Sequence, residues 1–234
     1  MIALGLCAAY VGAQRLNPYG MEPGRPEITR VLFQLFDLDG ENNIPTWYTS
    51  LLWAMAARMA WVAHRREPDL VIRRSWILLG SVFLLLSLDE AASLHERLLG
   101  LAGDTLQDAM GLEGSFYYGW VLLAGMLAML VAALLVPFVL RIRRDVAACL
   151  VVAAILFLSG SLGFETISSA VNLGWIASID RTGLTWTRLI ILEELLEMTG
   201  PILAIHASLL AAAPLRNGAP AEQRATSGAV RAAA

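Results

Sequence analysis

The sequence predicts an all-α, polytopic membrane protein, and three observations lead to this fold class. Of the 234 residues, 57% are hydrophobic and 16% are charged, with a mean hydropathy of +0.62. Soluble domains are nearer half apolar and a quarter charged. Several apolar runs have about 20 residues, the length of helix that crosses a bilayer. The runs lack the alternation of membrane strands, so the strand interpretation fails.

We predict about six membrane spans, or five if the first apolar segment does not cross. That segment, residues 2–13, is short and lacks the basic residues that open a signal peptide, so we interpret it as a short or amino-truncated span. Pro45 is predicted to open the second span, because a proline in the first turn leaves no hydrogen bond unmade. The elements that follow the first segment are expected at residues 28–36 (a short amphipathic piece), 45–63, 75 into the motif at 85–99, 116–140, 146–171 and 184–212.

Residues 1–213 are therefore predicted to form one helical transmembrane domain. Residues 214–234 consist mainly of Ala, Gly, Pro and Arg, and we expect a disordered tail.

The positions of the arginines predict the orientation. All 17 basic residues are Arg. They gather after the second span, after the fourth span and in the tail: Arg65, Arg66, Arg73 and Arg74; Arg141, Arg143 and Arg144; Arg216, Arg224 and Arg231. Because short loops rich in basic residues stay on the cytoplasmic side, these regions and both termini are predicted to be cytoplasmic. We expect a multi-pass protein of a bacterial cytoplasmic (inner) membrane, surrounded by lipid and with no nucleic-acid partner.

Acidic residues show the opposite distribution, with 16 of the 20 outside the cytoplasmic segments. At about 1.5 Å of rise per residue, Asp89, Glu165 and Glu193 all reach the outer half of the bilayer from separate helices. We therefore predict a shared, carboxylate-rich polar pocket that binds a divalent metal ion or protons. Its candidate residues are Asp89, Glu90, His95, Glu96, Glu165, Glu193, Glu194 and Glu197. On an uninterrupted helix Asp89, Ser93 and Glu96 would share one face, and His95 would point away from it.

The three acids of the last span carry most of the functional argument. An ionised carboxylate at a helix centre costs about 2.5–3.5 kcal/mol on insertion scales. Glu193, Glu194 and Glu197 must therefore be protonated, bound to a cation, or facing water. The structural alternative is that they pair with Arg188 or Arg97. For Asp89 and Glu96, the alternative is a helix end that emerges into water.

The external stretch FDLDGENNIPTWYTS, residues 36–50, offers oxygen ligands for calcium, but its spacing is not that of an EF-hand loop. A helix-capping turn before Pro45 is the preferred interpretation. The aromatic residues near the outer boundary are interpreted as an interfacial belt. They are Trp47, Tyr48, Phe116, Tyr117, Tyr118, Trp120, Trp175 and Trp186.

Two stretches, FDLDGENNIPTWYTS and LSLDEAASLHE, resemble a group of uncharacterised bacterial multi-pass membrane proteins. The resemblance implies a membrane protein and no activity. Three functions stay open. The first is cation binding, by a metal or by protons, in transport. The second is a metal-dependent, hydrolase-like enzyme acting on a lipid-like substrate. The third is an accessory subunit whose acids pair with a membrane partner or with a second copy. The sequence leaves open whether there is catalysis.

Overall fold

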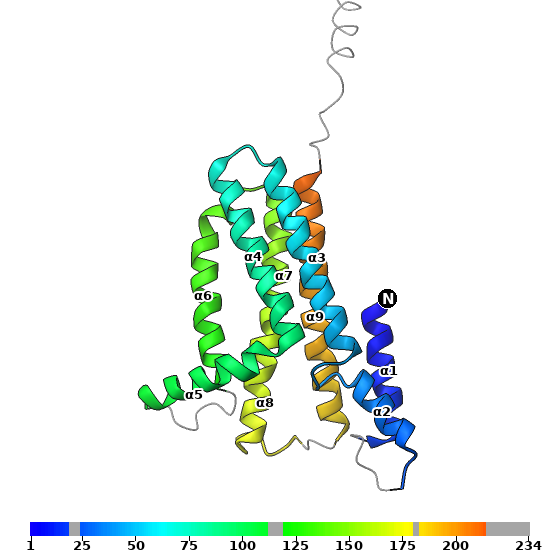
Figure 1. The fold of residues 1–234 in the computed structure, drawn as a ribbon. Coiled ribbons are helices and arrows are strands. Elements are labelled where there is room, and N and C mark those ends of the chain that lie inside the picture. The colour runs from blue at the N-terminus through cyan, green and yellow to red at the C-terminus, as the bar shows by residue number, and fades with distance from the viewer. Residues whose placement is uncertain (19–23, 112–118, 180–182, 214–234) are drawn as a thin grey trace, which may run out of the picture.

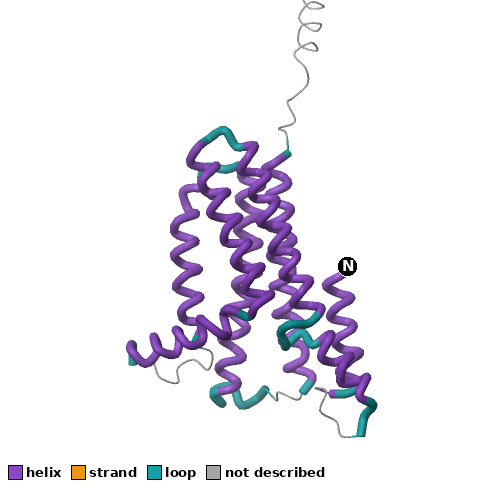
Figure 2. The backbone as a smooth tube through the Cα atoms, viewed as in Figure 1, coloured by secondary structure: helices purple, strands orange, loops and turns teal. Residues whose placement is uncertain are grey.

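A computed structural model describes residues 1–18, 24–111, 119–179 and 183–213, and every regular element within these ranges is a helix (Figures 1 and 2). Four helices are long and apolar enough to cross a membrane: α4 (Leu70–Ala92), α6 (Trp120–Val139), the continuous helix Arg144–Asn172, and α9 (Leu184–Ala212). The continuous helix comprises α7 (Arg144–Leu158), the π-helical segment η3 (Ser159–Phe164) and α8 (Glu165–Asn172). The predicted all-α membrane architecture is thus confirmed at this level.

Three further helices lie beside the candidate spans. Helix α3 (Ile44–Arg66) has 23 residues and runs antiparallel to α4, to which a short turn joins it (Figure 1). It is less apolar than the four candidate spans and is not among them. Helix α1 (Ile2–Leu16) is apolar but has only 15 residues, and it begins at mid-height of the bundle. The amphipathic α2 (Glu27–Phe36) packs against α1.

The predicted helix boundaries agree with the structure for the last span and differ from it for the third. The last span coincides with α9. The third span starts earlier than predicted, at Leu70, because Asp69 Oδ1 accepts hydrogen bonds from the backbone N–H groups of Val71 and Ile72. Asp69 therefore caps the first turn of α4. The predicted tail, residues 214–234, lies outside the described residues.

The main core lies between α3, α4, α7 and α9. Helix α3 presents small side chains to its neighbours, and Ala56, Ala57 and Ala60 are fully buried. The rings of Trp53 and Phe83 lie 5.2 Å apart and tie α3 to α4. A second core, between α1, α2 and α9, is centred on the fully buried Tyr10.

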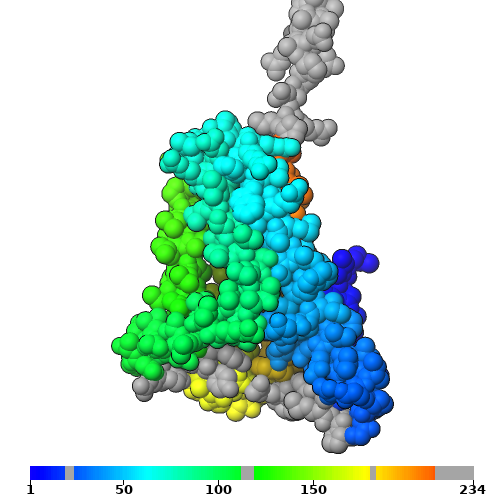
Figure 3. Space-filling model, viewed as in Figure 1, coloured from blue at the N-terminus to red at the C-terminus, as the bar shows by residue number. Residues whose placement is uncertain are grey.

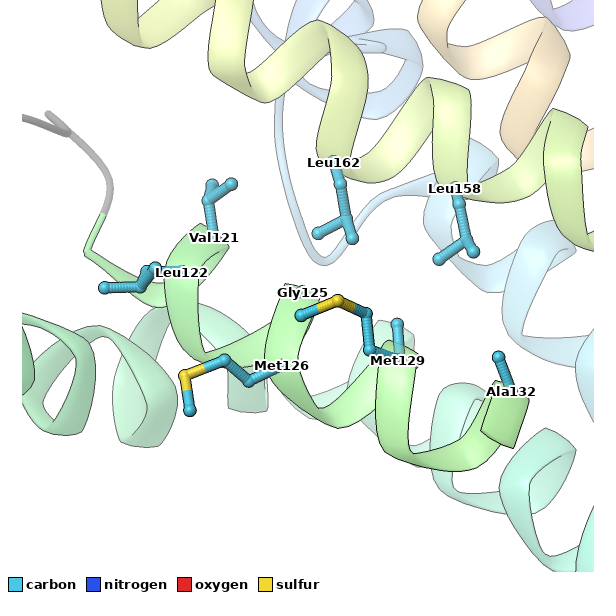
Figure 4. A pocket seen from close by; sticks show the side chains of 9 residues that line it. Val121, Leu122, Gly125, Met126, Met129, Ala132, Leu158 and Leu162 are labelled. Atoms are coloured by element: carbon cyan, nitrogen blue, oxygen red, sulfur yellow. The ribbon is translucent and has the colours of Figure 1, made fainter. Parts of the chain in front are cut away.

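Helix α6 stands apart from the bundle along most of its length. Its buried residues are Trp120 and Val121 at one end and Phe138 at the other. Between these ends a hollow separates α6 from its neighbours (Figure 3). Figure 4 shows this space, about 460 Å³, lined by apolar side chains such as Met129 of α6 and Leu158 of α7. None of the described residues that line it is titratable, so this hollow is separate from the predicted polar pocket.

Candidate functional site at the acidic end of the bundle

Helix α4 ends inside the motif that the sequence singles out. Ser93 adopts the left-handed conformation, with φ 50° and ψ 47°, which is uncommon for a residue other than glycine. Beyond it the chain continues as η2 (His95–Leu99) and α5 (Gly100–Ala109), which turn away across the end of the bundle (Figure 1).

The break at Ser93 folds His95 back onto the helix that it has just left. The backbone N–H of His95 donates to Asp89 Oδ1 at 2.7 Å, and its ring Nδ1 donates to Asp89 Oδ2 at 3.1 Å. The prediction that His95 points away from Asp89 is therefore wrong. It assumed an uninterrupted helix, and a single left-handed residue reverses the direction of the side chain.

Glu41 lies on the other side of the imidazole and was not predicted as a site residue. Its Oε1 lies 3.9 Å from His95 Nε2, and its Oε2 is buried without a hydrogen-bond partner in the described structure. We call Asp89, His95 and Glu41 the His95 bridge. The only sequence signal for Glu41 was the acidic stretch before Pro45, which we interpreted as a capping turn.

That capping turn is confirmed, and it explains how Glu41 is held. The side-chain Oδ1 of Asn43 accepts from the backbone N–H of Thr46 at 3.1 Å and caps α3. Its Nδ2 donates to the carbonyl oxygens of Asp37 and Gly40, both at 2.6 Å. The side-chain amide of Asn43 thus ties the start and the middle of the loop that carries Glu41 to the first turn of α3.

The ring of Trp120 covers His95, at a centroid separation of 4.7 Å. Trp120 and Trp186 are buried, so the prediction that they are interfacial anchors is wrong. Each occupies the first turn of a helix that starts at the acidic end, and its ring packs inward. Trp47 and Trp175 are both about two-thirds exposed, at 65% and 66%, as the belt interpretation requires. Residues 116–118 lie outside the described residues.

Five glutamates from three helical segments converge beneath the His95 bridge: Glu90 of α4, Glu165 of α8, and Glu193, Glu194 and Glu197 of α9. We call them the acid cluster. Glu194 interacts electrostatically with Glu90 and Glu193. Glu197 interacts with the same two residues and with Glu165. Each of the three helices singled out from the sequence contributes to the acid cluster, α4 through Glu90 and not through Asp89, whereas Glu96, on η2, is exposed.

A glycine lets the two longest helices meet at the acid cluster. A Cβ atom on Gly160 of η3 would lie 2.9 Å from the carbonyl oxygen of Glu193 and 2.7 Å from Cγ of Glu197. Helix α9 therefore packs directly on the backbone of η3. Such π-helical turns inside α-helices are frequent at functional sites.

A comparison with protein families gives one result that covers most of the chain. The model described as Domain of unknown function (DUF8692) matches residues 1–212. The chain belongs to this family. The matched region contains the acid cluster and the His95 bridge. No curated protein and no solved structure matches the chain.

Within the described part of this DUF8692 protein, no arginine neutralises the acid cluster. Among the described residues, none of the five in the acid cluster forms an ion pair with an arginine. Arg97 and Arg188, the two candidates from the sequence, are exposed. In the described part of the chain, no three His, Cys, Asp or Glu side chains are grouped closely enough to hold a metal ion.

The surroundings of the His95 bridge determine how its members titrate. Burial lowers the pKa of His95, but the hydrogen bond to Asp89 and the charges of Asp89, Glu41 and Glu96 outweigh it, so the pKa lies above its ordinary value of 6.5. Burial raises the pKa of Glu41 above 4.5. In both cases the folded protein holds the proton more tightly than the unfolded chain does.

We expect the midpoint of thermal unfolding to fall as the pH rises through neutrality. A raised histidine pKa stabilises the fold fully below pH 6.5, and this contribution is lost as the pH passes the folded-state pKa. Glu41 acts in the same direction, because the ionised form is the one that burial disfavours.

The measurement is a thermal melt of the purified protein at pH values between about 6 and 8. His95→Gln should flatten the slope, whereas His206→Gln, on an exposed residue of α9, should leave it unchanged. An equal slope in the wild type and in His95→Gln would contradict the assignment.

Proposed function

We propose that this is a multi-pass protein of a bacterial cytoplasmic membrane, in which the helices of the bundle form six spans. The length of α3 supports this, because 23 residues extend about 34 Å, enough to cross the hydrocarbon core. Helix α1, at about 22 Å, is the short sixth span. The arginines at the opposite end of the bundle from the acid cluster support a cytoplasmic location for that end and for both termini.

We further propose that the acid cluster binds a cation and that protons are the cation it takes. The observation that carries the proposal is the convergence of five glutamates, without an arginine partner among the described residues, inside the end of a membrane bundle. Ionised carboxylates in such a place are costly unless a cation neutralises them. Proton binding at this depth is a property of membrane proteins that couple proton movement to transport.

A divalent metal is the second cation to consider. Carboxylates are suitable ligands for hard cations, which need several oxygens at short distance. The described residues provide carboxylates, but no three of them lie close enough together to hold a metal ion. Binding a metal would require the side chains to move, whereas a proton needs a single carboxyl oxygen. The geometry therefore favours protons.

The test is infrared spectroscopy of the purified full-length protein across a pH titration, following the C=O stretch of protonated carboxyl groups. We expect Glu193→Gln/Glu197→Gln to lose part of this band while the fold stays intact. Glu27→Gln/Glu67→Gln removes the same number of carboxyls from positions outside the acid cluster and should leave the band unchanged. A band identical in the wild type and in the cluster variant would refute proton binding there.

Metal content, measured by plasma mass spectrometry on protein purified without chelator, separates the two cations. We expect less than one equivalent of any divalent metal. If the wild type contains a divalent metal in nearly stoichiometric amount and the Glu193→Gln/Glu197→Gln variant loses it, the cation bound by the acid cluster is a metal and not a proton.

The His95 bridge favours a second candidate function, an enzyme at the outer leaflet. Asp89 holds the imidazole in one orientation through two contacts, and Glu41 faces the other ring nitrogen. An oriented imidazole is a suitable general base, and a substrate reaching this end of a membrane bundle would be lipid-like. Release of a fatty acid or headgroup from outer-leaflet lipid, lost in His95→Gln, would support this candidate.

A further inference from the structure

The end of the bundle opposite the acid cluster contains a second, basic hollow. It has a volume of about 790 Å³ and lies between the α3–α4 turn, the connection from α6 to α7, and the end of α9. Three arginines line it, Arg66, Arg141 and Arg143, with the single acid Glu67. Its floor is apolar, with Trp76 and Val146 almost completely buried.

Two of the three arginines are held in place by the last turn of α9. The guanidinium of Arg66 donates to the carbonyl oxygen of Ala212, and that of Arg143 donates to the carbonyl oxygen of Leu210 at 3.1 Å. A guanidinium has five N–H donors, so each keeps donors for another group. Arg141 forms no hydrogen bond or ion pair with the described residues.

The charge at this end is not balanced by the acids around it. Seven arginines lie in the two connections or in the helix ends beside them, against three acids, Glu67, Asp69 and Asp145; the arginines are Arg65, Arg66, Arg73, Arg74, Arg141, Arg143 and Arg144. Asp145 pairs with Arg143 at 2.5 Å, and Asp69 caps α4. The tail beyond residue 213 cannot neutralise the excess, because it holds three arginines and one glutamate.

We propose that this hollow binds the phosphate headgroup of an anionic membrane lipid. Arginine guanidinium groups match phosphate oxygens in geometry and charge. Basic pockets between membrane helices on the cytoplasmic side are suited to anionic headgroups. The apolar floor at the end of candidate spans favours a lipid over a free phosphate, since it provides a surface for the glycerol and the first methylenes. The site is independent of the proton binding at the other end.

The test uses full-length protein in a zwitterionic detergent and follows the unfolding midpoint as lipid is added. Phosphatidylglycerol is compared with phosphatidylcholine and with inorganic phosphate. We expect phosphatidylglycerol alone to raise the midpoint in a saturable way. Arg66→Gln/Arg141→Gln should raise the half-saturating concentration by about ten-fold or more, and Arg141→Gln alone, which breaks no described bond, by about five-fold.

The matched control is Arg65→Gln/Arg74→Gln. It removes the same charge at the same end, from exposed arginines that do not line the hollow, and should change the half-saturating concentration by less than about two-fold. Equal losses in the control and the pocket variants would overturn the proposal in favour of diffuse attraction. An equal response to phosphatidylcholine, or a full response to inorganic phosphate, would overturn it as well.

Discussion

Gly160→Ala is expected to lower the free energy of unfolding by about 2–3 kcal/mol, although alanine is the better helix former. The added Cβ would lie 2.9 Å from the carbonyl oxygen of Glu193 and 3.2 Å from the backbone nitrogen of Glu197. Both are backbone atoms of α9, so a rotamer change cannot remove the clash. The helices would have to separate at the acid cluster itself.

The measurement is chemical or thermal unfolding of the purified protein, with Gly125→Ala as the matched control. Gly125 is also helical and lies in a candidate span, but its added Cβ would have no neighbour within 4 Å. We expect the control to be neutral or stabilised by up to about 1 kcal/mol. If Gly160→Ala is as stable as Gly125→Ala, the close contact between η3 and α9 is not present in the protein.

Asn43→Ala is expected to cost about 2–4 kcal/mol and to release the loop that carries Glu41. The substitution removes the cap of α3 and the two hydrogen bonds to the carbonyl oxygens of Asp37 and Gly40. Loss of an N-cap alone costs about 1 kcal/mol, and each net hydrogen bond contributes about another 1 kcal/mol. Because Asn43 is buried, water cannot fully replace these partners.

Asn43→Ser separates the two roles, since serine is also a favourable N-cap residue and lacks the amide donors that reach the carbonyl oxygens of Asp37 and Gly40. We expect its stability to lie between those of the wild type and Asn43→Ala. Asn42→Gly is the neighbouring control, because Asn42 is exposed and has a φ of 59°, which glycine adopts without strain. The loop carries His95's second carboxylate neighbour, so Asn43→Ala should also flatten the pH dependence of the melt. A wild-type melt for Asn43→Ala would show that Asn43 does not organise the loop.

The two ends of the bundle have complementary chemistry. At one end five glutamates lie below the His95 bridge, and at the other three arginines line a hollow with an apolar floor. Most polar side chains between them are small, such as Ser50 and Ser87, which hydrogen-bond across α3 and α4. Our proposals for the two ends can therefore be tested separately, with variants that do not share contacts.

The sequence by itself determined the properties that depend on local composition. The length of apolar runs predicted the helices, and α9 coincides with the predicted span because the run is bounded by Gly183 and by the Ala-rich end. The spacing of Glu193 and Glu197 placed them on one helix face. The depths of Asp89 and Glu165 followed from the rise per residue, which predicted that separate helices carry carboxylates to the same end of the bundle.

The tertiary structure alone decided how the acidic end of the bundle closes. The left-handed Ser93 turns His95 toward Asp89, and no periodicity signals a single residue of that conformation. Glu41 reaches His95 from 54 positions earlier in the chain, and Trp120 covers the imidazole from the start of α6. The helical periodicity of a sequence indicates which residues share one face of a helix. Which element packs against that face depends on where the chain turns, and this is decided only in the folded molecule.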